Sequence, residues 1–229
     1  MSDKGVKVLS DAVLRDLGAP ELWPKWRDGW PNRADLALLD AVYSTRQRYE
    51  TSVLPKVKKW RHKYVTPEIP ELRYLSQIDE NEISDVFGQT IMPGVRSPEG
   101  HRKKKSVGVV ETARRLCAHL PRLASADDII TEVARNGRER TVALLRETKG
   151  IGPATASYFL ILLGIDGVKV DTLLGSWVRS QLGDPSLTDN AITTLVAETA
   201  SGFERQARDL DYAIWRHESA RRGNRRRRN

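Results

Sequence analysis

The stretch over 141–164 reads TVALLRETKGIGPATASYFLILLG, and VKVDT follows it over 168–172. Before the two glycines, the apolar spacing predicts a short amphipathic helix that ends near Glu147. Pro153 then opens a second helix, a position that suits proline because the first helical N–H has no partner in any case. This second helix is apolar nearly all round over 154–163, which predicts burial at the centre of a domain.

Gly150 and Gly152 allow a tight turn between these helices and bring backbone N–H groups to the surface at a helix N-terminus. Such donors converge on an anion, and the helix dipole favours negative charge at the same place. The pattern therefore predicts a phosphate-binding hairpin, with Ile151 packed inward and Lys149 adding positive charge beside it. An ordinary helix–turn–helix corner with two capping glycines is the alternative.

The rest of the chain also favours an all-α fold. Its 229 residues are 39% hydrophobic and 30% charged, an ordinary globular balance. Apolar residues recur at helical spacing along the chain, and one helix is expected over 103–120. Strand signals are poor, since Val168 and Val170 are too few to start a sheet, and the residues over 92–94 are typical of a turn.

Charge and cysteine content narrow the class of function. Lys and Arg number 38 against 30 Asp and Glu, a net charge of +8, and six of the cations lie over 221–228. A basic chain indicates a polyanionic partner, most often nucleic acid, although a solubilising tail is the alternative for the terminal arginines. A single cysteine, Cys117, cannot build an iron–sulfur or zinc site, and no apolar run is long enough to span a membrane.

The motif KGIGPATA over 149–156, with VDT downstream at 170–172, resembles the helix-hairpin-helix (HhH-GPD) DNA glycosylase superfamily, in particular its endonuclease III-like group. Weaker similarity extends over 28–220. Residues 36–47 resemble the early helix of the family, which ends in a glutamine near the DNA, and residues 211–217 resemble its closing helix.

The resemblance implies an all-α glycosylase fold of two lobes with a central cleft. One lobe, over 28–165, is of the six-helix type and ends in the helix-hairpin-helix. The second lobe combines 1–27 with 166–220, and a disordered basic tail follows over 221–229. Asp171 is then expected at the mouth of the cleft, where binding sites tend to occur.

Asp171 precedes an apolar periodic run that begins at Leu173, which makes it a natural N-cap. The resemblance implies a second role for Asp171 as the catalytic residue. Cleavage of an N-glycosidic bond builds positive charge on the sugar ring, and a fixed carboxylate stabilises that cation. A cap with no catalytic role is the alternative.

The resemblance and the charges also assign DNA contacts. Phosphates are expected to bind some of Lys103 to Lys105 and the hairpin, that is Lys149, Gly150, Ile151, Gly152, Ala154 and Thr155. A flipped base needs aromatic walls, and the candidates, each of which has core packing as its alternative, are Tyr43, Tyr158, Trp177 and Trp215. The gap left in the duplex is expected to be filled by Gln47 with its neighbours Arg46 and Arg48.

Two departures from the family pattern refine the expected reaction. Members with lyase activity carry a lysine late in the hairpin motif, where this chain has Ala154, and many members end in an iron–sulfur cysteine array, where this chain ends in arginines. The resemblance therefore implies a cluster-free, monofunctional glycosylase of base excision repair that removes a damaged, modified or mispaired base by hydrolysis. Two alternatives stay open: a non-catalytic DNA-binding module, and a glycosylase/lyase that uses Lys149 or Lys169.

The expected partner is double-stranded DNA, bound by a monomer. Neither a cofactor, a metal nor a membrane is expected to take part. The expected place of action is the cytoplasm with its nucleoid, or the nucleus in a eukaryote.

Overall fold

The protein folds almost entirely into helices, which confirms the all-α prediction. The computed structural model describes residues 3–24, 26, 29–64, 69–96, 100–119 and 122–228, with side chains up to Arg222. The chain divides into two compact units, Asp28–Ile165 and Met1–Arg27 with Asp166–Asn229. The divisions after residues 27 and 165 fall where the two lobes are expected from the sequence.

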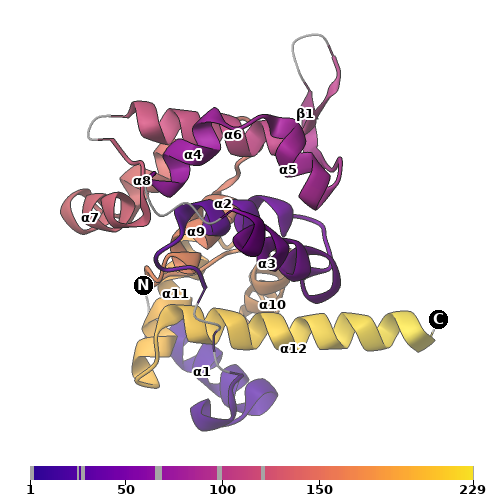
Figure 1. Ribbon diagram of the computed structural model, residues 1–229. Helices are drawn as coiled ribbons and strands as arrows, with labels where there is room; N and C mark the ends of the chain where they lie inside the picture. Colours follow the sequence, from indigo (N-terminus) through magenta and orange to yellow (C-terminus); the bar gives the residue numbers. More distant parts are fainter. Residues whose placement is uncertain are drawn as a thin grey trace. The chain divides into compact units, whose positions relative to one another are not determined.

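The larger unit consists of helices and one small hairpin of strands (Figure 1). Its elements are, in chain order, α2 (Ala34–Tyr43), the π-helical turn η2 (Tyr49–Val53), α3 (Leu54–Lys63), α4 (Glu71–Gln77), α5 (Glu80–Phe87), β1 (Ile91–Arg96), β2 (Arg102–Lys104), α6 (Lys105–Ala118), α7 (Ala126–Asn136), α8 (Arg138–Arg146) and α9 (Pro153–Leu162).

Helix α2 is the centre of this unit. All ten of its residues are buried, and it contacts α3, α4, α6 and α9. It buries an acid near its start because Asp35 accepts two hydrogen bonds, of 2.8 and 2.7 Å, from the guanidinium of Arg33, and a charge with good partners can be taken out of water. Helix α9 packs on α2 and is buried at Ala156 and over 159–162, as its apolar sequence predicts.

The two strands form an antiparallel hairpin that projects from the ends of α5 and α6 (Figure 1). An irregularity of the ladder lies between its two cross-strand pairs. The pairs are Ile91 with Lys104 and Arg96 with Arg102.

Two predictions for this segment are wrong. Residues 92–94, expected as a turn, lie within β1, and the helix expected over 103–120 begins at Lys105, because 102–104 form β2; residue 120 lies outside the described residues. A strand can be recognised in a sequence when its buried face makes apolar residues alternate with polar ones. Such a pattern is missing here because Met92 is the only buried residue of β1.

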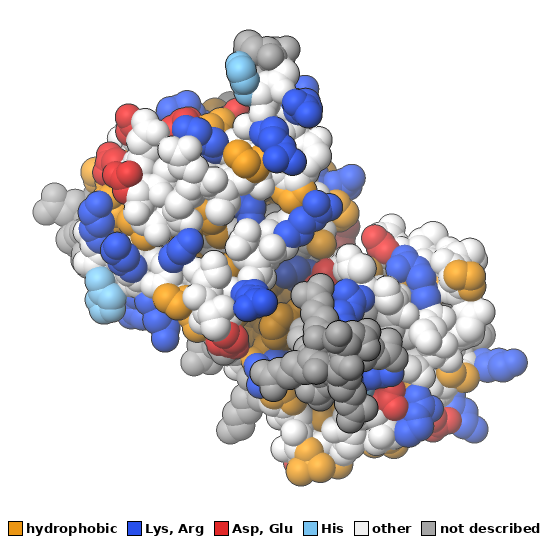
Figure 2. Space-filling model, turned by 90° about the vertical axis from the view of Figure 1, so that its right-hand side faces the viewer, with side chains coloured by type: hydrophobic (Ala, Val, Ile, Leu, Met, Phe, Trp, Pro, Cys, Tyr) orange, Lys and Arg blue, Asp and Glu red, His pale blue; other side chains and the backbone are white. Residues whose placement is uncertain are grey.

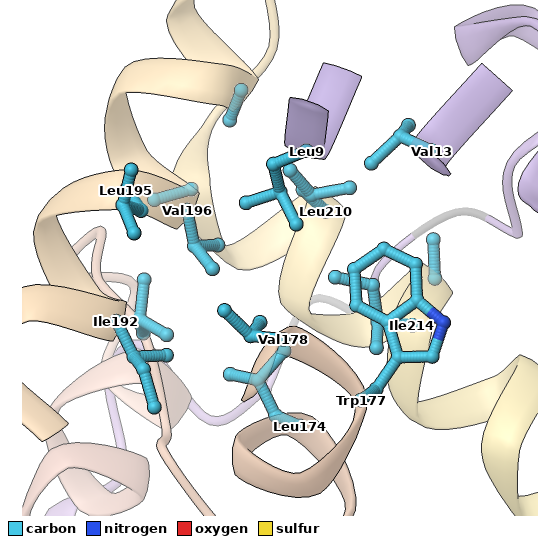
Figure 3. Close-up of a cluster of buried hydrophobic side chains, with 14 of the residues drawn as sticks. Leu9, Val13, Leu174, Trp177, Val178, Ile192, Leu195, Val196, Leu210 and Ile214 are labelled. Carbon is cyan, nitrogen blue, oxygen red and sulfur yellow. The ribbon is translucent and has the colours of Figure 1, made fainter. Parts of the chain in front are cut away.

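The smaller unit is a helical bundle whose elements are α1 (Asp3–Leu17), the 3-10 turn η1 (Pro20–Leu22), α10 (Thr172–Leu182), α11 (Asp189–Gly202) and α12 (Ala207–Arg228). All four α-helices contribute to one apolar core. Figure 3 shows Leu9 and Val13 of α1 directed toward Leu174 and Trp177 of α10, with Leu210 of α12 among them.

The prediction of a disordered tail over 221–229 is wrong for 221–228, because the backbone of these residues continues α12. Asn229 lies outside the described residues. A helix that packing has already nucleated is extended at little cost, and arginine is a good helix former. The arginine run by itself indicates a solvated tail, whereas the helix that precedes it extends into the run.

Candidate functional site

The corner between α8 and α9 is a tight turn. The Ile151 N–H donates to the Thr148 carbonyl at 3.0 Å, and Gly150 between them has φ of 100°, a conformation that strongly favours glycine. The Ile151 side chain is only 4% exposed and anchors the turn in the core. One prediction is corrected here: the Ile151 amide is used within the turn, so it is not a donor for a phosphate.

The N-terminus of α9 is open. Gly152 is its N-cap and supplies no side-chain cap, and Pro153 follows at the start of the helix. The amides of Ala154 and Thr155 lie in the first turn, where an α-helix has no acceptor of its own. A Cβ atom built on Gly152 would meet nothing within 4 Å. An anion can therefore approach these donors, and the dipole of α9 favours negative charge at this point.

The two glycines of the turn differ in their surroundings. A Cβ atom on Gly150 would lie 2.7 Å from Met92 Sδ and 3.1 Å from Val95 Cγ2, both on β1. Gly150 is thus required for packing, whereas Gly152 leaves space for a ligand. Lys149 is exposed in the same turn, and its carbonyl accepts a hydrogen bond of 3.2 Å from Lys103 Nζ.

Asp171 is the N-cap of α10, as predicted. Its Oδ1 accepts from the amides of Leu173 at 2.8 Å and Leu174 at 3.0 Å. Both donors use the same oxygen, and no donor in the described part of the smaller unit is bonded to Oδ2. The side chain is partly exposed. One carboxylate oxygen is therefore fixed by the helix and the other remains able to face a ligand.

Two further carboxylates, which the sequence analysis did not single out, fix the loop before Asp171. Asp166 accepts from the first amides of α12, those of Ala207 at 3.2 Å and Arg208 at 3.1 Å. Asp211, on α12, accepts from the Lys169 amide at 2.7 Å. The loop that carries Asp171 is thus attached to α12 at two points and to α10 at its end. The only signal in the sequence is an acid at each place, which could equally be a solvated side chain.

The predicted wedge residues lie in an exposed turn after α2. Arg46, Gln47 and Arg48 are all exposed, and Arg46 has φ of 57°, which is uncommon for a residue with a side chain. The turn is stabilised from below by the buried Asp40. Its carboxylate accepts hydrogen bonds from the hydroxyls of Ser44 at 2.9 Å and Tyr49 at 2.8 Å, which lie on either side of the turn.

Lys105 supports the same turn from α6. It is only 1% exposed, and its Nζ donates to the carbonyls of Thr45 at 2.8 Å and Tyr43 at 3.2 Å. Phosphate contacts were expected from some of Lys103 to Lys105, and Lys105 is not one of them, because its ammonium group is enclosed beneath the turn. Burial lowers the pKa of Lys105 to about 8, since a charged amine is costly to remove from water.

This burial predicts a pH-dependent stability. Between pH 8 and pH 10.5 the unfolded chain binds more protons at Lys105 than the folded chain does, so the free energy of unfolding rises with pH in this window. We expect wild type to gain roughly 1 kcal/mol per pH unit relative to Lys105→Met between about pH 8 and 9.5. Burial raises the pKa of Tyr43, so its hydroxyl stays neutral over this range. Urea unfolding at several pH values measures the difference.

Lys59→Met removes an exposed lysine instead, and it should leave the pH profile of wild type unchanged. Parallel profiles for wild type and Lys105→Met would contradict the expected burial cost.

Two of the four aromatic residues predicted as pocket walls are core residues instead. Tyr43 is 2% exposed and packs on Phe87, with ring centroids 4.3 Å apart. Trp177 is 3% exposed within the core of the smaller unit. Both belong to the cores, because the apolar faces of α2 and α10 point inward. The other two candidates, Tyr158 and Trp215, are half-buried.

Among the described residues, no group of three or more His, Cys, Asp or Glu side chains is placed to hold a metal ion. In the same part of the chain, no helix combines the length and the apolar character needed to cross a membrane.

The fold and the site define an all-α protein. One unit has an open, glycine-capped helix N-terminus, and the other has a carboxylate N-cap of which one oxygen has no donor among the described residues of that unit. The chain belongs to the family described as a domain of unknown function (DUF8548), whose model matches residues 7–219. No curated protein matches the chain.

Proposed function

We propose that this protein is a DNA glycosylase of base excision repair that hydrolyses the N-glycosidic bond of a base flipped out of duplex DNA. The observation that carries the proposal is the open N-terminus of α9 at Gly152, followed in the chain by the Asp171 cap with its free oxygen. This ordered set is the one on which the resemblance to helix-hairpin-helix glycosylases depends.

In this proposal the α8–α9 corner binds the DNA backbone. The open amides of Ala154 and Thr155, with the exposed Lys149 nearby, suit a phosphate group, which carries charge and accepts several hydrogen bonds. Such contacts position a duplex without reading its sequence. The exposed turn at Gln47 suits the task of filling the place of an extruded nucleotide, because Asp40 and Lys105 make it rigid.

Asp171 is the proposed catalytic residue for cleavage of the N-glycosidic bond. The bond from C1′ to the base nitrogen breaks, its electron pair leaves with the base, and positive charge develops on the sugar ring. The Asp171 carboxylate stabilises this charge electrostatically. A water molecule then bonds to C1′, and the proton that it loses goes to the departed base, so the products are the free base and an abasic site. Because Ala154 stands where lyases of the family carry lysine, we propose hydrolysis without a covalent adduct and without a cofactor.

A panel of duplexes tests this proposal. Each duplex carries one altered base, namely uracil, an alkylated purine, oxidised guanine, a mispaired adenine or a modified cytosine, and borohydride is added in parallel reactions. Release of a base without a trapped protein–DNA adduct supports the proposal. A trapped adduct favours the lyase alternative, and tight binding with no release from any duplex favours a non-catalytic module.

The arginines at the C-terminus should contribute to nonspecific affinity. Truncation after Gly223 removes Arg225 to Arg228, and each phosphate contact that is lost lowers the slope of log K against log salt by about 0.9. Fluorescence anisotropy with an undamaged duplex at several salt concentrations measures the slope. An unchanged slope would mean that the C-terminal arginines do not bind DNA. The proposed place of action is the chromosome, in the nucleoid or the nucleus.

A further inference from the structure

The β1–β2 hairpin is strongly basic. The sequence over 91–104 has four Lys or Arg residues and one acid, Glu99. Arg96, His101 and Arg102 are exposed, and Figure 2 shows Lys, Arg and His side chains on the projection at the top of the view. A net positive projection of this kind is the footprint of a polyanion-binding surface.

The lysines and the arginines of this hairpin differ in whether an acidic side chain lies beside them. Lys103 forms an ion pair with Glu111, and Lys104 lies 3.7 Å from Glu80. Arg96, by contrast, donates to the Gly100 carbonyl at 2.7 Å and has no acidic partner within the described chain. The Arg102 side chain forms neither a hydrogen bond nor an ion pair with the described residues. Within the described residues, acids thus neutralise the two lysines, and no acid pairs with either arginine.

The two arginines also lie opposite each other. Arg96 and Arg102 are cross-strand partners in the register of the hairpin, and like charges in that position destabilise a strand pair. A two-stranded sheet is only marginally stable by itself in water. An anion bound between or beside the two guanidinium groups removes this repulsion, so the arrangement itself indicates an anionic ligand.

The hairpin is firmly attached to the α8–α9 corner. The Met92 side chain fills the space beside two glycines, because a Cβ atom on Gly108 would lie 2.6 Å from its Cε and one on Gly150 would lie 2.7 Å from its Sδ. The Lys103 ammonium adds a hydrogen bond to the Lys149 carbonyl. The hairpin that carries the two arginines therefore packs directly against the corner that precedes the open end of α9.

We propose that the β1–β2 hairpin is a second DNA-backbone contact, in which Arg96 and Arg102 bind phosphates of the same duplex that the N-terminus of α9 engages. The identity of the ligand as duplex DNA rests on the proposed function. A guanidinium group offers planar, paired donors that match phosphate oxygens. The contact is independent of base sequence, and its contribution falls as salt rises.

The test compares two double variants of equal charge. Arg96→Gln/Arg102→Gln removes the hairpin arginines, whereas Arg122→Gln/Arg135→Gln removes two exposed arginines near the start of α7 and on α7 itself, which lies at the opposite end of the larger unit from β1 in Figure 1. For the hairpin variant we expect the salt slope of duplex binding to fall by about two and affinity at physiological salt to fall roughly ten- to fifty-fold. The α7 control should retain the wild-type slope.

Two further variants separate an effect of charge on DNA binding from an effect on folding. Arg96→Lys/Arg102→Lys preserves the charge and should restore most of the affinity. Arg102→Glu changes one side chain that has no bonded partner in the described chain, so it should lower affinity without lowering the melting temperature. An equal slope for the hairpin variant and wild type, or equal losses for the two Gln double variants, would overturn the inference.

The same measurements separate this inference from the proposed function. If wild type releases a base and the hairpin variant binds DNA as wild type does, the inference fails and the glycosylase proposal stands. If the hairpin variant loses affinity but wild type releases no base from any duplex, the glycosylase proposal fails and the DNA contact stands.

Discussion

Asp171→Asn is expected to lower the rate of base release by at least about 10²–10³, with little change in DNA affinity or folding. Asparagine is as good an N-cap as aspartate, so the amides of Leu173 and Leu174 keep an acceptor. Only the negative charge is lost, and this charge matters most when the sugar becomes cationic. Single-turnover release from the substrate that the duplex panel identifies, together with anisotropy and thermal unfolding, measures the three quantities.

The matched control is Asp79→Asn. Asp79 is the N-cap of α5 and accepts from the Asn81 amide at 2.8 Å, so the same chemical change is made at a cap with no proposed catalytic role. We expect this variant to release the base at the wild-type rate. If Asp171→Asn also keeps the full rate, Asp171 is a structural cap only, and the proposed chemistry is wrong.

Valine at Gly152 and valine at Gly150 should have opposite effects. At Gly152 the backbone has φ of −85° and ψ of 173°, which valine adopts readily, and the new side chain enters open space. Because valine is a poorer N-cap than glycine, the stability should fall by no more than about 1 kcal/mol. DNA affinity should fall on the order of tenfold or more, because the side chain occupies the place of the phosphate.

At Gly150 the same change should damage the fold. The φ of 100° costs a residue with a side chain about 1–2 kcal/mol, and the overlap with Met92 adds about 1–3 kcal/mol of overpacking. Chemical denaturation and duplex binding of both variants test the contrast. Gly202→Val, at the end of α11 where a Cβ also meets nothing within 4 Å, is the control and should change neither quantity. Wild-type DNA affinity in Gly152→Val would contradict the role of the α9 N-terminus.

Part of the candidate site follows from local sequence because its physics is local. A proline after Gly152 starts a helix, an aspartate before an apolar run caps one, and a buried Ile151 between glycines closes a turn. Each of these interactions joins residues within about four positions of one another, so spacing alone identifies them.

The placement of long side chains could not be predicted in this way. Lys103, Lys104 and Lys105 are consecutive cations, yet the first two form ion pairs and the third is enclosed beneath the turn after α2. Tyr43 and Trp177 are likewise aromatic residues on helices whose buried faces depend on which partners pack against them. No pattern in the sequence distinguishes a half-exposed aromatic wall from a core residue.

The sequence by itself determined the all-α class, the glycine turn before α9 and the N-cap at Asp171, because helix propensity, proline and glycine geometry and capping act between near neighbours. Only the tertiary structure decided that β1 and β2 pair, that Met92 fills the space beside Gly108 and Gly150, and that Asp166 and Asp211 fix the Asp171 loop to α12. Those contacts join residues far apart in the chain, and packing of the whole unit, which local spacing does not encode, selects them.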